Sequence, residues 1–182
     1  MKRSTFILSS LLIVAVCFVV IGDKSAPSAN PKSERRELRE ARRAEQQAAM
    51  EREIDSIVLA RAFIFRPQTA QVEPAGRMLM LSNPNFEVRI WDGAADIFIP
   101  YISGPIPPYR HTIINYTITR LDGYTAIQTE NGWRITFSSG LYTASRFNFD
   151  FEINSKFGST TLTLSNTMNN EVSYSGMITK IY

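Results

Sequence analysis

The sequence has few of the residue types on which most catalytic and metal sites depend. Among 182 residues there is one cysteine, Cys17, and one histidine, His111. No intramolecular disulfide can form, and a two-imidazole metal site or a histidine-based triad has at most one candidate member. A glycine-rich phosphate loop, a Gly-x-Ser-x-Gly elbow and a His-Glu-x-x-His motif are also missing. We therefore predict no metal, no cofactor and no enzymatic activity, and we interpret His111 as a hydrogen-bonding residue where a strand begins.

The C-terminal two thirds of the chain lack an excess of charge of either sign. The whole sequence carries a formal net charge of +3, but from residue 62 onward nine basic residues face nine acidic ones. Electrostatic steering of a polyanion requires a field of one sign. We therefore predict that nucleic acid is not a partner.

The N-terminal segment has the pattern of an export signal. Met1 to Arg3 supply a basic start, and residues 6–21 form an apolar run that is short for a membrane-spanning helix. We predict a signal peptide over residues 1–22, with an uncleaved membrane anchor or lipidation at Cys17 as alternatives. The protein is then expected to be exported, periplasmic or envelope-associated, and to reach the membrane only through this segment.

A linker and a helix are expected next. Residues 23–33 are small, polar and proline-containing, whereas residues 34–62 contain neither glycine nor proline. This composition predicts a flexible linker followed by a charged helix. In the second half of that helix, apolar residues recur at helical spacing: Met50, Ile54, Ile57 and Val58. We expect this half to dock on the following domain, and the first half, with its mixed charges, to be a solvated spacer.

Residues 63–182 read as short strands with turns between them. Phe147, Phe149, Phe151 and Ile153 alternate with polar residues, which places them on one buried face. The pairs Asp122-Gly123 and Asn131-Gly132 favour two hairpin turns, and hence a three-stranded meander. The pattern predicts an all-β domain, an antiparallel sandwich or barrel of about nine or ten strands.

The stretch from Phe86 to Tyr101 and the proline-rich loop that follows carry the candidate binding residues. Trp91, Tyr101 and Tyr109 lie beside turns or loops, and we predict that they form an exposed aromatic platform able to stack a sugar ring or grip a peptide. The alternative is a glycan or cell-wall hydrolase whose acid and base are Asp92 and Asp96. Turns select aspartate for its backbone hydrogen bonds, which favours the first interpretation.

Four short motifs add a resemblance to a known family. They are AFIFRP at residues 62–67, IPY at 99–101, GWRI at 132–135 and SYSG at 173–176. In their order and spacing, residues 57–182 resemble an exported family of Bacteroidetes-type bacteria described as domain of unknown function 4251. The resemblance implies a small exported or lipid-anchored protein and supplies no catalytic residues. We therefore expect a non-enzymatic cell-envelope module that binds an envelope protein, a peptide or a glycan.

Overall fold

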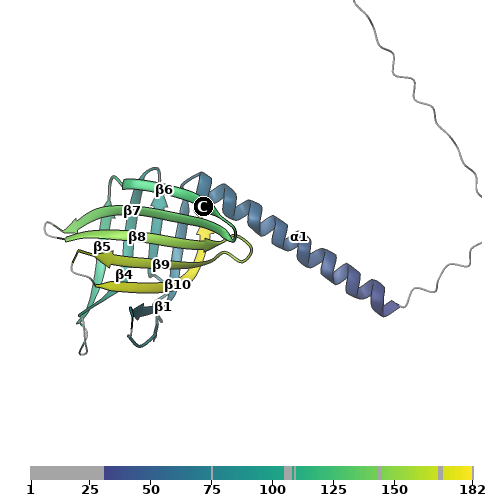
Figure 1. The fold of residues 1–182 in the computed structure, drawn as a ribbon, viewed down its shortest axis with the longest axis horizontal. Coiled ribbons are helices and arrows are strands. Elements are labelled where there is room, and N and C mark those ends of the chain that lie inside the picture. The colour runs from purple at the N-terminus through teal and green to yellow at the C-terminus, as the bar shows by residue number, and fades with distance from the viewer. Residues whose placement is uncertain are drawn as a thin grey trace, which may run out of the picture.

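The structure is a computed structural model that describes residues 31–74, 76–104, 108, 110–142, 145–167 and 170–181. The predicted signal peptide, Cys17 and residues 23–30 lie outside the described residues. Among the described residues, one helix precedes ten strands (Figure 1). They are α1 (Pro31–Leu59), β1 (Phe63–Val72), β2 (Leu79–Met80), β3 (Glu87–Trp91), β4 (Ala94–Ser103), β5 (Arg110–Ile118), β6 (Asp122–Thr129), β7 (Gly132–Tyr142), β8 (Ser145–Asn154), β9 (Ser159–Asn166) and β10 (Glu171–Lys180).

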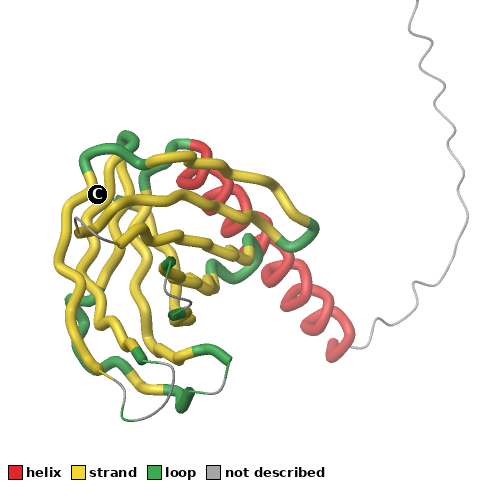
Figure 2. Tube along the Cα trace, turned by 60° about the vertical axis from the view of Figure 1, so that its left-hand side comes forward, coloured by secondary structure: helices red, strands yellow, loops and turns green. Residues whose placement is uncertain are grey.

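The ten strands form one antiparallel sheet whose two halves meet at the first and last strands. Hydrogen-bonded neighbours follow the order β5-β4-β3-β1-β10-β9-β8-β7-β6, and the short β2 pairs with β1. The sheet curls into a half-barrel, so β7 to β10 cross in front of β4 and β5 in Figure 1, and Figure 2 shows the curl from the side. The predicted antiparallel all-β class with one N-terminal helix is confirmed.

The predicted meander is only partly correct. β6 and β7 form a hairpin, but β5 and β6 are the two edges of the sheet and do not pair. The connection between them is held elsewhere: Leu121 is buried, and its N–H donates to the carbonyl of Gly93 at 2.9 Å. Asp122 and Gly123 are the first two residues of β6 and do not form a turn between two paired strands. The pairing register with β7 shifts at this point, and Gly123 has a φ of 63°. Glycine at positive φ is typical of a β-bulge as well as of a hairpin turn.

The core lies inside the curl and is rich in phenylalanine. The four residues predicted to be buried on β8 are buried: Phe147, Phe149, Phe151 and Ile153. The Phe151 ring lies 5.9 and 5.7 Å from the rings of Phe63 and Phe65 on β1, and 6.0 Å from that of Phe137 on β7. It thereby joins the two halves of the sheet. The hydroxyl of buried Tyr174 donates to the carbonyl of Pro100 at 2.7 Å, and burial raises the pKa of this tyrosine well above its ordinary value.

Only the C-terminal part of α1 packs on the sheet. Ile54, Ile57 and Val58 are buried, whereas all residues from 32 to 49 are exposed, and this half projects away from the strands (Figure 1). Asp55 fixes the docked part by accepting a 2.7 Å hydrogen bond from the indole N–H of Trp133. Within the described part of the chain, no helix is both long and apolar enough to cross a membrane.

The exposure of the first half of α1 predicts that it contributes nothing to folding. Deleting residues 23–47 should leave the thermal unfolding midpoint within about 1 °C of the full chain, because linkers without tertiary contacts tolerate removal. A deletion extended to residue 55 is the matched control, since it also removes Ile54 and the Asp55 hydrogen bond. Differential scanning calorimetry distinguishes the two deletions. A drop of several degrees in the shorter deletion would show that the projecting half packs on the sheet.

Candidate functional site

The predicted aromatic platform does not assemble. Trp91 ends β3 opposite Ala94, whereas Tyr101 lies seven positions further along β4. At about 3.3 Å a residue, the two positions are about 23 Å apart. Tyr109, the third predicted member, lies outside the described residues.

Tyr101 is a core residue, which corrects the expectation that it is exposed. It is 8 % exposed because it continues the inward-facing series of Ala95, Ile97 and Ile99 along β4. Its hydroxyl accepts hydrogen bonds from the side-chain amides of Asn166 and Asn170, at 3.0 and 2.9 Å. Burial raises the pKa of Tyr101, and the hydrogen bond from Asn170 acts in the opposite direction.

The two aspartates of the predicted acid–base pair do not line the same groove. Asp92 is exposed in the turn after β3, with a φ of 46°, while Asp96 lies on the outer face of β4 and accepts a 2.6 Å hydrogen bond from the hydroxyl of Thr117. Asp96 lines a surface groove to which Asp92 does not contribute. A glycosidase needs both carboxyl groups at one scissile bond. The described residues also contain no cluster of three His, Cys, Asp or Glu side chains that suits a metal ion.

The groove beside Asp96 is the candidate site, and we call it the outer groove. It has a volume of about 330 Å³ and lies on the outer face of β3, β4 and β5. Its polar and aromatic lining residues are Asn85, Glu87, Asp96, Phe98, Asn115, Tyr116 and Thr117. This volume is at the lower end of the range for small-molecule sites.

Strand alternation explains why most of these side chains share one face. Val88 and Ile90 of β3, like Ile97 and Ile99 of β4, point into the core, so the residues between them point outward. The pairing register then sets Phe98 between Glu87 on β3 and Asn115 on β5. Asp96 is set in the same way between Arg89 and Thr117.

Phe98, which lines the outer groove, packs its ring against that of Phe86. The rings of Phe86 and Phe98 have their centroids 5.4 Å apart at an interplanar angle of 46°, and both residues are partly exposed. Phe98 is the one large apolar side chain on the outer face of a strand whose other apolar residues point mainly inward. An aromatic ring in such a position is available to a ligand.

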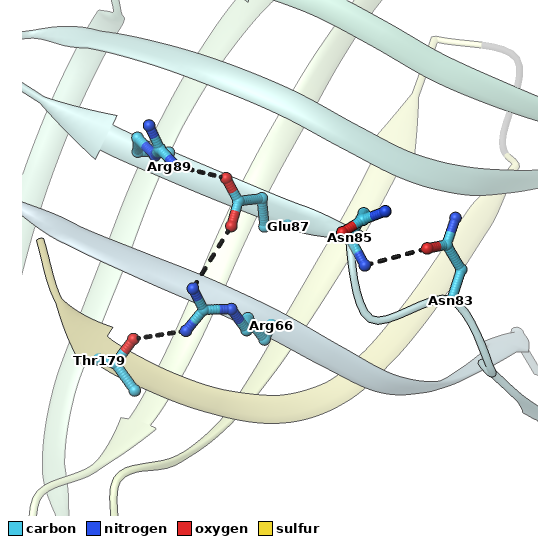
Figure 3. Close-up of polar contacts among 6 residues, drawn as sticks. All are labelled: Arg66, Asn83, Asn85, Glu87, Arg89 and Thr179. Carbon is cyan, nitrogen blue, oxygen red and sulfur yellow. Dashed lines mark hydrogen bonds and ion pairs between the residues drawn. The ribbon is translucent and has the colours of Figure 1, made fainter.

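Ion pairs fix one wall of the outer groove (Figure 3). Glu87 lies between two guanidinium groups: its Oε1 is 2.8 Å from Arg89, and its Oε2 is 3.7 Å from Arg66. Arg66 also donates a 3.1 Å hydrogen bond to Thr179 on β10. The network spans three neighbouring strands and leaves the charge of Glu87 compensated.

Other polar groups at the outer groove have no partner in the described part of the protein. The side-chain amides of Asn85 and Asn115 are exposed and make no hydrogen bond to another described residue. Of the two Asp96 oxygens, Oδ1 accepts from Thr117, and Oδ2 has no partner among the described residues. The groove therefore offers donors and acceptors around a half-exposed ring.

A larger hollow of about 580 Å³ lies on the outer face of β7, β8 and β9. Its described lining is polar, and its one aromatic residue, Trp133, is 9 % exposed, with its N–H engaged by Asp55. Beside it, Arg134 forms a two-pronged ion pair with Asp150. Because no exposed ring contributes, this hollow is less suited to a ligand with an apolar face.

Of the residues that line the outer groove, the sequence analysis singled out only Asp96. The sequence analysis did not identify Phe98 as a site residue, because it lies between Ile97 and Ile99 in a run that reads as uniformly apolar. Strict alternation would have placed it opposite the core, and an aromatic residue on the outer face of a strand is the signal that identifies it. Asn115 joins the site only through the β4–β5 pairing, which the sequence does not specify.

Comparisons with known proteins identify relatives without identifying an activity. The sequence model of a family described as "Domain of unknown function (DUF4251)" matches residues 45–178. No curated protein matches the chain. A crystal structure of a DUF4251 family protein from Bacteroides eggerthii superimposes with a TM-score of 0.57 at 13 % sequence identity, covering 74 % of this chain and 91 % of that one. At this identity, the likeness shows a shared fold.

Proposed function

The chain belongs to the DUF4251 family, and from that premise we propose that it is a non-enzymatic binding module of the cell envelope that holds a glycan in the outer groove. The single observation that carries the proposal is the partly exposed ring of Phe98, flanked by two side-chain amides and one carboxylate oxygen that have no partner among the described residues. The envelope location is supported by the basic and apolar pattern of residues 1–22.

A sugar matches the outer groove because it has both an apolar and a polar surface. The C–H groups of a pyranose ring can rest on Phe98, and its hydroxyls both donate and accept hydrogen bonds. Asn85 and Asn115 each offer an amide donor and a carbonyl acceptor, and Oδ2 of Asp96 offers an acceptor.

The charge balance of the outer groove favours a neutral glycan. The two positive charges of Arg66 and Arg89 balance the two negative charges of Glu87 and Asp96, because Glu87 lies between the two guanidinium groups and Asp96 lies opposite Arg89 in the pairing register. An anionic ligand would meet Asp96, and no unpaired cation lines the groove among the described residues. The site is also built on paired strands, which lowers the ordering cost of binding.

Binding is favoured over hydrolysis by the state of the two carboxylates in the outer groove. Glycosidases use one carboxyl group as an acid and a second as a base or nucleophile. Both oxygens of Glu87 lie next to guanidinium groups, so Glu87 is an ion-pair partner in the wall of the groove. Asp96 alone cannot fill both roles.

Affinity electrophoresis tests the proposal. The full chain is run in native gels that contain starch, xylan, mannan or a mixed-linkage β-glucan, and in parallel is sedimented with purified peptidoglycan. We expect retention by at least one of these polymers, and Phe98→Ala should weaken it about thirtyfold, as for a central aromatic contact. Phe157→Ala is the matched control, because Phe157 is 55 % exposed and lies in the turn after β8, outside the groove.

Two outcomes would contradict the proposal. One is an absence of retention by all five polymers in a protein that unfolds cooperatively at its normal midpoint. The other is release of reducing sugar from the retained polymer that is lost in Asp96→Asn, which would make the protein a hydrolase. Equal retention of Phe98→Ala and the unmodified chain would show that the polymer binds outside the outer groove.

A further inference from the structure

The projecting half of α1 separates its charges onto two faces. Along the sequence, acidic and basic residues alternate, but successive residues of an α-helix are rotated by about 100°. With Lys32 set at 0°, all the basic residues of this half fall within an arc of about 120°. They are Lys32, Arg35, Arg36, Arg39, Arg42 and Arg43. We call this face the basic stripe.

The acidic residues of the same segment occupy a different arc. Glu34, Glu37, Glu40 and Glu45 fall between about 80° and 220° on the same scale. An ion pair between the two faces joins Arg36 to Glu40 at 2.8 Å, where the two arcs meet. Arg35, Arg39, Arg42 and Arg43 make no ion pair with any described residue. The positive charge of the stripe is therefore not neutralised within this helix.

We propose that the basic stripe binds the phosphate head groups of an anionic phospholipid membrane. All side chains from residue 32 to 49 are exposed, and this end of the helix is far from the strands in both views (Figures 1 and 2). A flat anionic surface can therefore reach the first turns of α1 before it meets the β domain. The β domain itself is neutral by count from residue 62 onward and does not repel such a surface.

The position of the stripe in the chain favours a membrane over other polyanions. The apolar run at residues 6–21 is separated from α1 by residues 22–30 alone. A segment of that length spans at most about 30 Å, so in the uncleaved chain, where the apolar run serves as a membrane anchor, the stripe stays within reach of the head groups. Basic residues next to an apolar anchor are attracted by anionic lipids, and two weak attachments together hold a protein where one does not. The inference does not depend on the glycan site.

Vesicle flotation tests the inference on the full chain. Vesicles of phosphatidylcholine alone are compared with vesicles that contain phosphatidylglycerol, so that the apolar run contributes to both and the difference reports the stripe. We expect at least tenfold stronger partitioning to the anionic vesicles, falling as salt is raised from about 0.05 to 0.5 M.

A charge-exchange variant keeps composition and helix propensity while it breaks the stripe. The quadruple variant R36E/E37R/R39E/E40R moves two basic side chains out of the arc and two acidic ones into it. It should lose most of the preference for anionic vesicles. The matched control A41E/E45A exchanges two residues on the opposite side of the helix and should keep the preference.

Three results would overturn the inference. The first is equal partitioning to both kinds of vesicle. The second is an unchanged preference for anionic vesicles in the quadruple variant, because net charge alone would then explain the binding. The third is salt-sensitive binding to single-stranded RNA that the quadruple variant loses, without any preference among vesicles. That third result would assign the stripe to nucleic acid.

Discussion

Replacing Phe151 with alanine should lower the free energy of unfolding by about 3–5 kcal/mol, the range for a fully buried phenylalanine. Phe151 is completely buried, and its ring makes edge contacts with Phe63 and Phe65 and a stacked contact with Phe137. These partners come from both halves of the curled sheet. The cavity left by alanine would therefore lie where the two halves are held together, and little backbone there is free to collapse into it.

Urea unfolding followed by circular dichroism measures this loss. Phe157→Ala is the control, because Phe157 lies in the turn that follows the same strand and is mostly exposed. It should change the unfolding free energy by less than about 0.5 kcal/mol. A loss below about 1 kcal/mol in Phe151→Ala, at an unchanged slope, would mean that the two halves are held by other contacts.

Asp55→Ala should cost about 1.5–3 kcal/mol, the range for a hydrogen bond to a charged group whose partner is left unsatisfied. The carboxylate accepts a 2.7 Å hydrogen bond from the indole N–H of Trp133. Trp133 is almost completely buried, so its donor has no ready replacement in water. The same substitution should loosen the docked turns of α1.

Glu53→Ala is the matched control for Asp55→Ala, because it removes a carboxylate two residues away that is exposed on the same helix. Urea unfolding gives the free energies, and hydrogen exchange at the amides of Ile57 and Val58 reports the docking of α1. If Asp55→Ala and Glu53→Ala are equally stable, the helix is held by its apolar residues alone.

The strands and the core could be predicted from the sequence because both follow from local alternation. Phe147, Phe149, Phe151 and Ile153 have period two, and all four are buried. The order of the strands could not be predicted in this way. Asp122-Gly123 has the composition of a hairpin turn, yet the burial of Leu121 sends the chain from one edge of the sheet to the other. A tertiary contact here overrides a local turn signal.

The sequence motifs on which the family resemblance was argued explain the fold better than the function. Tyr174 of the SYSG motif bonds to the carbonyl of Pro100 in the IPY motif. Gly176 faces Pro67 at the β1–β10 bulge, where a Cβ atom would collide with the carbonyl of Arg66. Trp133 of the GWRI motif binds Asp55 on the helix. These residues hold neighbouring strands and the helix together in the half-barrel. A resemblance that depends on them therefore predicts the fold and does not locate a binding site.

The candidate site could not be predicted from the sequence, for a different reason. Its members come from three strands, and Phe98 lies between Glu87 and Asn115 only because of the pairing register. Register is set by the whole sheet, not by any one strand. The positions of the basic stripe, by contrast, follow from a rotation of 100° a residue along the helix. They could be assigned because α1 is one continuous helix whose first half is exposed.

The most direct measurement of the central claim is a two-dimensional ¹⁵N–¹H nuclear magnetic resonance titration. The isotope-labelled full chain is titrated with an oligosaccharide prepared from the polymer that retains it in the gels. Occupation of the outer groove predicts saturable shifts at the side-chain amides of Asn85 and Asn115 and at the backbone amides of Phe98 and Thr117. Shifts confined to Arg134, Glu152 and Thr161, which line the larger hollow on β7 to β9, would contradict the assignment of the glycan to the outer groove.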